Sequence, residues 1–305
     1  MILTRLFKSA FTNSSARASA AAPDLQIQAQ LANLELRARQ SWDDGRAADA
    51  VALAVQLLAT QADNLLAHML LAAASLPGEG YIQLLGRIHQ TYRPRTYLEI
   101  GVAAGNSIVL VQPGTLAIGI DPAPAISHVL PASTRIFAQT SDAFFAEHDV
   151  RAEFGGAGVE LAFIDGLHRF ESALRDFINV ERYCTPASTV LVHDCFPLDA
   201  ATAARERGTT FWSGDVWKLI VCLKQYRSDL SVHTVAAAPT GLGVIRNLDP
   251  SSTILSDHWE QILADFVGLP YSSLGPGKAQ ALNLVPNEWG HLVALLGSAP
   301  GSTAG

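Results

Sequence analysis

Short apolar runs alternate with helix-compatible segments from Thr96 onward, and this alternation limits the fold more than any other feature. Five runs read as strands: TYLEIGV, TLAIGID, STRIFAQ, ELAFIDG and STVLVHD, with intervening segments such as RFESALRDFINVERYC. Such alternation predicts a parallel sheet covered by helices on both faces. Two later runs, SVHTVAAA and GLGVIRNL, are joined by too few residues for a parallel crossover. We therefore expect a doubly wound, Rossmann-like α/β fold, with a mostly parallel seven-stranded sheet that ends in an antiparallel hairpin.

The region before the first strand is rich in Ala and Leu and has helical spacing. Residues 24–83 read as helices separated by turns at Asp44-Gly45 and Asp63-Asn64, and the stretch resembles one tetratricopeptide-like unit. One such repeat cannot bury its own face. We expect a helical cap docked on the main domain or half of a homodimer interface, with a peptide-binding array as the alternative.

The remaining boundaries follow from composition. Residues 1–23 carry Arg and Lys without acids, which predicts a disordered basic tail; an organelle-targeting segment is the alternative. The main domain is expected at 84–250. Residues 251–305 then form a C-terminal extension, with the helix-like SDHWEQILADFVG and a flexible tail, GSAPGSTAG.

Composition excludes several classes of partner. Hydrophobic residues make up 49% of the 305, yet no uninterrupted apolar run approaches the ~20 residues that span a bilayer, so no membrane span is expected. The net charge of −7, without a dense basic cluster, argues against nucleic acid as a partner. Cys184, Cys195 and Cys222 form no CxxC pair, which fits a reducing cytoplasm.

Polar residues follow each of the first five expected strands. In open α/β sheets, ligands bind beyond the carboxyl ends of the strands, near the point where strand order reverses. We therefore expect one binding site built from these strand ends. In chain order the residues are Glu99, Gly101 and Gly105, then Asp121, then Ser141 and Asp142, then Asp165 and His168, and finally His193 and Asp194.

The first loop distinguishes between nucleotide-binding classes. Its spacing, E-x-G-x-x-x-G-x-S, departs from the dinucleotide fingerprint G-x-G-x-x-G. Asp121 follows Glu99 by 22 residues, where a carboxylate can accept both hydroxyls of a ribose. The ordered motifs EIGxxxGxS, GID, FIDGxH, HD and GDVWK, within residues 84–250, resemble a bacterial family of class I S-adenosylmethionine-dependent methyltransferases.

The resemblance implies S-adenosyl-L-methionine as cofactor and a role for each motif. It implies that the segment from Glu99 to Gly105 lines the methionine end, that Asp121 binds the ribose and that Ser141-Asp142 flank the adenine. Ala103 replaces a third glycine found in many methyltransferases and fits if its φ is negative. The alternatives are a capping or salt-bridging Glu99, a turn-forming Asp121, and Ser141-Asp142 as a cap for AFFAEH. The implied cofactor-binding set is Glu99, Gly101, Ala103, Gly105, Ser107, Asp121, Ser141, Asp142 and Asp165.

Asp165, His168, His193 and Asp194 are the candidate catalytic residues. Methyl transfer needs alignment, a dry cavity and a route for the acceptor's proton. Three interpretations stay open: a divalent cation such as Mg²⁺ held by Asp165 and Asp194, as in a related metal-dependent branch; a histidine general base; or a structural network. Cys195 stands where that branch usually has Asp or Asn, and a thiol is a poor Mg²⁺ ligand.

FWSGDVWK, residues 211–218, is the second concentrated motif. Its candidate substrate contacts are Trp212, Asp215, Trp217 and Lys218. The alternative is structural, with Asp215 as N-cap of WKLIVCLKQY and Trp217 packed in the core. Residues 240–243, TGLG, are interpreted as hairpin geometry.

The expected activity is O-methylation of a sugar or other small polar metabolite, in which the acceptor class follows from the resemblance alone. Two alternatives remain. One is an NAD-dependent dehydrogenase, which the glycine spacing disfavours. The other is a noncatalytic interaction protein that uses the helical cap and retains cofactor binding.

Overall fold

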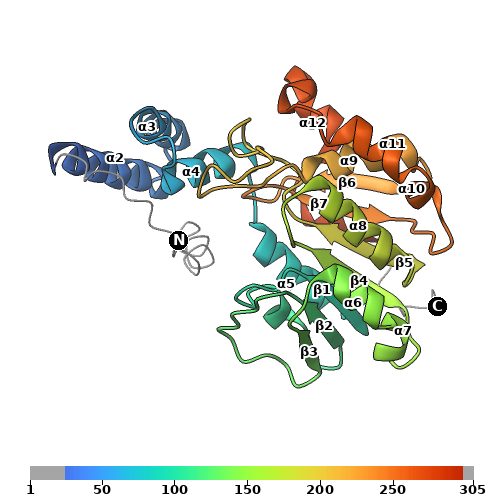
Figure 1. Ribbon diagram of the computed structural model, residues 1–305. Helices are drawn as coiled ribbons and strands as arrows, with labels where there is room; N and C mark the ends of the chain where they lie inside the picture. Colours follow the sequence, from blue (N-terminus) through green and yellow to red (C-terminus); the bar gives the residue numbers. More distant parts are fainter. Residues whose placement is uncertain (1–24, 298–305) are drawn as a thin grey trace.

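A twisted sheet with helices on both faces forms the body of the molecule (Figure 1), which a computed structural model describes for residues 25–297. The eight strands are ordered β3-β2-β1-β4-β5-β7-β6-β8. Only β7 runs antiparallel to its neighbours, and it does so against both β5 and β6. The strands are β1 (Thr96–Ile100), β2 (Leu116–Ile120), β3 (Thr134–Phe137), β4 (Val159–Ile164), β5 (Cys184–Val192), β6 (Ser231–Val235), β7 (Leu242–Arg246) and β8 (Leu284–Val285).

The mostly parallel sheet and its antiparallel hairpin are therefore confirmed, whereas the expected number of seven strands is wrong. The additional strand, β8, pairs in parallel with β6 through two residues. Two residues are too few to produce a recognisable alternation in the sequence.

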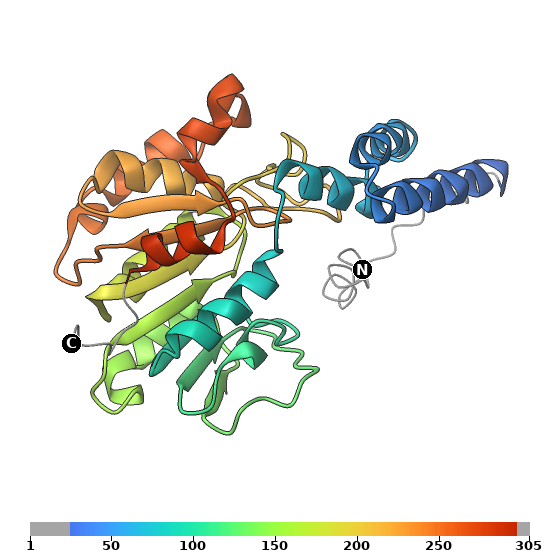
Figure 2. The same ribbon diagram turned by 180° about the vertical axis from the view of Figure 1, so that it is seen from behind.

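Alternation along the strands assigns side chains to two separate cores. Leu98 and Ile100 point to the face covered by α6 (Ser141–Glu147), α8 (Phe170–Glu181) and α9 (Trp217–Tyr226). Tyr97 points to the opposite face, which is covered by α5 (Tyr81–Tyr92) and α13 (Trp289–Leu296) and is seen in Figure 2. Both faces of the central strands are apolar, as expected for a parallel sheet covered on both sides.

Short elements complete this body. They connect strands or cover the sheet beside the longer helices. They are η1 (Ile108–Leu110), α7 (Val150–Glu153), α10 (Ile254–Asp257), α11 (Trp259–Phe266), η2 (Tyr271–Gly277) and α12 (Lys278–Ala281).

Three N-terminal helices project away from the sheet as an arm: α2 (Leu25–Asp43), α3 (Ala47–Thr60) and α4 (Leu65–Ser75) (Figure 1). Gly45, with φ of +77°, lies in the turn after α2, and Asn64 caps α4 by accepting the backbone N–H of Ala67 at 2.9 Å. These turns lie where the sequence predicts them. The arm's role as a cap or dimer interface stays a prediction.

The next helix, α5, packs on the sheet and does not belong to the arm. Its Leu84, Leu85 and Ile88 are buried against the sheet. The boundary expected between residues 83 and 84 thus falls inside a helix.

Two tails lie outside the described residues: the expected N-terminal tail, residues 1–23, and residues 298–305 of the expected C-terminal tail. Between residues 25 and 297, no helix combines the length and apolar character that crossing a membrane requires.

Candidate active site

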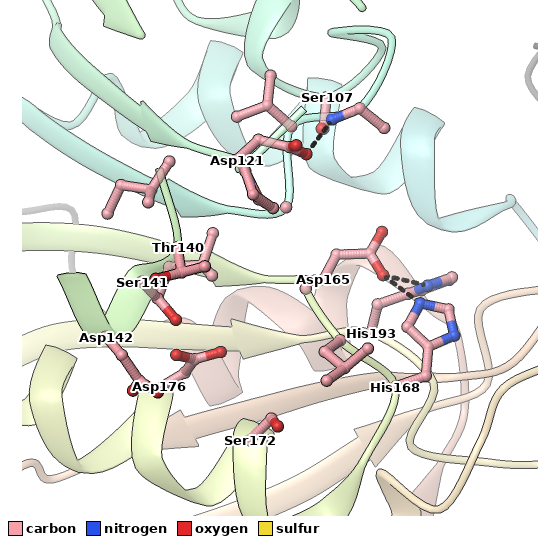
Figure 3. A pocket seen from close by; sticks show the side chains of 18 of the residues that line it. Ser107, Asp121, Thr140, Ser141, Asp142, Asp165, His168, Ser172, Asp176 and His193 are labelled. Carbon is pink, nitrogen blue, oxygen red and sulfur yellow. Dashed lines mark hydrogen bonds and ion pairs between the residues drawn. The ribbon is translucent and has the colours of Figure 1, made fainter. Parts of the chain in front are cut away.

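A cavity of about 680 Å³ opens at the carboxyl ends of the central strands (Figure 3). It lies beside β1 and β4, the neighbours at which strand order reverses, where open α/β sheets bind ligands. The strand ends contribute Gly101, Asp121, Asp165 and His193, and α8 supplies a second wall. The volume is in the range of pockets that enclose a small molecule.

Asp121 lies directly against the glycine turn. Its Oδ2 accepts the backbone N–H of Ala103 at 2.8 Å, and its Oδ1 accepts that of Ala123 at 2.7 Å. Gly101 has φ of +88°, and a Cβ there would overlap the carbonyl oxygen of Asp165. The turn therefore requires glycine at this position so that the ends of β1 and β4 can meet.

Ala103 also adopts a left-handed conformation, with φ of +45°. The expectation of a negative φ at this position is wrong. Its N–H donates to Asp121, and its carbonyl accepts the N–H of Ala125 at 2.8 Å. These two bonds hold a conformation that costs an L-residue about 1 kcal/mol.

Glu99 does not reach the cavity. Its side chain is fully buried on the Tyr97 face of β1, where Tyr97 Oη donates to Oε2 at 2.6 Å and Ser107 Oγ donates to Oε1 at 2.5 Å. Burial raises the pKa of Glu99 to about 8, although both hydroxyl donors oppose the shift. Ser107 lines the cavity, whereas Glu99 and Gly105 do not. As placed, Glu99 orients Ser107 instead of contacting a ligand.

The four candidate catalytic residues do lie together. His193 Nδ1 is 3.2 Å from Asp165 Oδ1, and His168 Nδ1 is 3.1 Å from Asp194 Oδ2. Figure 3 shows Asp165 joined to both histidines. Asp194 sits behind the cavity wall, and its buried Oδ2 receives no well-oriented hydrogen bond. A residue outside the expected set, Thr240, bonds His193 Nε2 through its hydroxyl at 3.1 Å.

The carboxylates keep both histidines charged. Burial lowers the pKa of His168, but Asp194 and Asp165 outweigh it and raise that pKa to about 9. At His193, too, burial lowers the pKa, but Asp194 and Asp165 outweigh it and raise the pKa to about 10. Burial of Asp165 is likewise outweighed by the two histidines, so its pKa is lowered. A protonated imidazole accepts no proton, which opposes the general-base interpretation in this state.

Three of these side chains have the spacing of a metal site. One ligand atom each of Asp165, His168 and Asp194 lies within 4.8 Å of the others. Cys195 offers no fourth ligand, because its Sγ contacts the Val192 carbonyl at 3.4 Å and burial raises the pKa of its thiol.

Residues 98–195 match the family model of a methyltransferase domain. The match runs from β1 to the residue after Asp194, so it contains the glycine turn, Asp121 and the catalytic candidates. No curated protein matches the chain.

Several solved structures resemble it at low identity. Cofactor-bound Rv0187 from MTB has 13% identity and a TM-score of 0.43, covering 63% of this chain and 94% of that one. The O-methyltransferase TomG from Streptomyces achromogenes, involved in tomaymycin synthesis and bound to SAM, has 16% identity and a TM-score of 0.40. The match covers 54% of this chain and 78% of TomG. An O-methyltransferase from Bacillus cereus in complex with SAH has 13% identity and a TM-score of 0.40. The match covers 57% of this chain and 86% of that one.

The FWSGDVWK motif packs beside the cavity and holds the start of α8. Asp215 Oδ1 accepts the N–H of Phe170, the first residue of α8, at 2.7 Å, and Lys218 Nζ donates to Asp215 Oδ2 at 2.9 Å. Asp215 therefore caps α8 and not α9, the helix that the sequence indicated. Trp217 is 1% exposed and packs in the core. None of these three residues lines the cavity, so their expected substrate contacts stay a prediction that the structure does not support.

Trp212 also lies outside the lining, but it touches a residue that lines it. Its ring stacks on His168 at a centroid distance of 5.1 Å, and its Nε1 donates to the Ala204 carbonyl at 2.6 Å. Gly214, at φ +61°, allows the motif to approach the His168 carbonyl, which a Cβ would overlap.

Several residues that line the cavity or shape it lie outside the sequence motifs. Tyr81, outside the matched segment, stacks on His193 at 4.0 Å. Thr140, not Ser141 or Asp142, caps α6 by accepting the N–H of Ala143 at 3.2 Å. The helix α8 presents Ser172, Arg175 and Asp176 to the cavity. Their i, i+3, i+4 spacing is the signal that could have indicated a common face.

Proposed function

We propose that this chain is an S-adenosylmethionine-dependent methyltransferase. One observation carries the proposal: Asp121 faces a cavity while hydrogen-bonded to the glycine turn, inside the segment that matches a methyltransferase domain. An ionised carboxylate has about four lone-pair positions, and backbone N–H groups occupy two at Asp121. The others can accept the two hydroxyls of the cofactor's ribose.

The acceptor is proposed to be a hydroxyl of a sugar or small polar metabolite, held beside Asp165. Asp165 lines the cavity and lies against two histidines that favour its ionised form. It can therefore accept a hydrogen bond from the acceptor hydroxyl and orient its oxygen toward the methyl group. As the O–CH3 bond forms and the S–CH3 bond breaks to leave a neutral thioether, the hydroxyl proton passes to Asp165. Methyl transfer is a displacement in line with the sulfur, so such alignment contributes directly to rate. Tyr81 and His193, whose rings stack, line the cavity on this side.

A divalent cation is a second component of the proposal. Asp165, His168 and Asp194 would hold it, which requires His168 to lose its proton and the ion pair between His168 Nδ1 and Asp194 Oδ2 to open. When bound, the cation would lower the pKa of an acceptor hydroxyl as a Lewis acid. One imidazole and two carboxylates suit Mn²⁺ or Zn²⁺ as well as Mg²⁺.

Calorimetric titration of the purified chain tests the proposal. S-adenosylmethionine and S-adenosylhomocysteine should bind, and NAD should not. Binding of NAD alone would contradict the proposal and favour a dehydrogenase. The cation is tested by titrating Mn²⁺ and Mg²⁺ into wild type and into Asp194→Asn. If both proteins give equal heats of binding, or if neither gives any, the cation is removed from the proposal. Methyl transfer from labelled cofactor to a panel of hydroxylated metabolites then separates an enzyme from a noncatalytic binding protein.

A further inference from the structure

The cavity has two chemically different ends. Asp165, His168 and His193 form one end, and Thr140, Ser141, Asp142 and Asp176 form the other, with Asp121 between them (Figure 3). On the proposed function, on which this inference rests, the sugar binds at Asp121 and the methyl group faces Asp165. The nucleobase must then occupy the end beside α6 and α8.

Asp176 is the unusual residue of that end. It is 4% exposed, lines the cavity and lies on α8. Within residues 25–297 no Lys, Arg or His forms an ion pair with it, because the adjacent Arg175 pairs with Asp142 at 2.7 Å. The hydroxyl of Ser141 is its hydrogen-bond partner. A buried carboxyl without a cation is costly when ionised, so its presence in the cavity wall requires an explanation.

The surroundings of Asp176 favour its neutral form. Burial raises its pKa to about 7; the Ser141 hydroxyl opposes this, Asp142 at the start of α6 adds to it, and Arg175 opposes it. The same residue thus holds its proton in much of the population near neutral pH. Asp142, by contrast, is half exposed, and its carboxylate already forms an ion pair with Arg175.

We propose that Asp176, as a neutral carboxylic acid, binds the N1/N6 edge of the cofactor's adenine. Adenine presents an N–H donor at N6 beside an acceptor at N1. A carboxylate offers acceptors only and would face N1 with a lone pair, whereas a neutral acid offers both a carbonyl acceptor and an O–H donor. The carbonyl of Asp176 accepts the N6–H, and its O–H donates to N1. The recognised ligand class is therefore an adenine nucleoside with an unsubstituted N1.

Substitution by asparagine is the sharpest test, because an amide also presents one acceptor and one donor but does not titrate. The dissociation constant of S-adenosylhomocysteine is measured by calorimetry from pH 6 to pH 9 for wild type, Asp176→Asn and Asp176→Leu. Wild type should weaken about tenfold per pH unit above 7, since only the protonated form binds. Asp176→Asn should match wild type within about threefold at pH 6 and should keep that affinity up to pH 9, while wild type weakens, because an amide does not titrate. Groups that titrate in both proteins cancel in this comparison.

Two further arms separate a ligand contact from a structural role. Asp176→Leu should lose about tenfold or more at pH 6, the effect of removing a hydrogen-bonding pair. The 1-deaza analogue of S-adenosylhomocysteine should bind wild type at least about tenfold more weakly, while the 7-deaza analogue, which keeps N1 and N6, serves as control. Far-UV circular dichroism checks that each variant folds. If Asp176→Leu does not fold, the pH dependence of Asp176→Asn and the affinities of the two deaza analogues still test the contact between Asp176 and adenine.

The contrary results are distinct. A wild-type affinity parallel to that of Asp176→Asn at every pH, or tight binding of the 1-deaza analogue, would overturn the role of Asp176 and leave the methyltransferase proposal standing. Absence of any binding of S-adenosylhomocysteine or S-adenosylmethionine to wild type would overturn the proposed function, and this inference with it.

Discussion

Replacing Glu99 by Gln should change how the stability of the fold depends on pH. Glu99 is fully buried between Tyr97 and Ser107 and does not line the cavity. Its pKa is raised from 4.5 to about 8, mainly by burial. An amide keeps the size and both hydrogen-bonding positions of a protonated carboxyl but has no proton to lose.

The sign and size follow from this shift. Between pH 4.5 and pH 8 the folded chain keeps a proton on Glu99 that the unfolded chain has lost, so the free energy of unfolding falls as pH rises through this window. Each pH unit changes it by about 1.4 kcal/mol. From pH 5 to pH 8 wild type should therefore lose about 4 kcal/mol more than Glu99→Gln.

Urea denaturation followed by circular dichroism at pH 5, 6, 7 and 8 gives the two curves. Their difference isolates Glu99, because every other titrating group is shared. Glu260→Gln, at an exposed position of α11, supplies the matched control and should run parallel to wild type. If Glu99→Gln also runs parallel to wild type, Glu99 does not hold a proton in the folded chain and the reasoning from its burial is refuted.

Three other substitutions test separate parts of the structure. Asp121→Asn should weaken S-adenosylhomocysteine binding about 10- to 100-fold by calorimetry, since hydrogen bonds to a charged group contribute about 1.5–3 kcal/mol; unchanged affinity would remove Asp121 from the ribose site. Gly214→Ala should lower the free energy of unfolding by more than about 2 kcal/mol, because its Cβ would overlap a backbone oxygen at positive φ. Gly208→Ala, which meets open space, is its control, and equal effects of the two would speak against the tight approach. Arg227→Met should cost about 3–5 kcal/mol in urea unfolding, since it strands the buried Glu181 that Arg227 contacts at 2.7 Å; a loss below ~1 kcal/mol would show that Glu181 finds another partner.

The sheet was predictable because its information is local. Each strand carries its own apolar run, and the polar residues after the runs meet at one edge once the strands are parallel. Asp121, Asp165, His168 and His193 reach the cavity for this reason. The burial of Glu99 was also accessible, because a period of two places it on the Tyr97 face of β1.

Other features depend on packing between distant segments. Asp215 caps a helix that begins 45 residues earlier in the chain, and the local pattern around it only indicates a cap for the helix that follows. The conformation of Ala103 is set by a hydrogen bond from its own N–H to Asp121. The polar face of α8 is visible as a spacing, but which part of it meets the cavity depends on where α6 packs.

The arm and the cavity are mechanically joined by two consecutive residues. Phe211 stacks on His68 of α4 at 5.5 Å, and Trp212 stacks on His168 at the cavity. Asp63, in the turn between α3 and α4, also accepts the N–H and hydroxyl of Thr210. A chain shortened to the sheet would lack His68, against which Phe211 packs. Trp212, the next residue, would then be held less firmly against the His168 ring. Catalytic measurements on a shortened chain would then describe an altered pocket, so the arm has to be kept when activity is assayed.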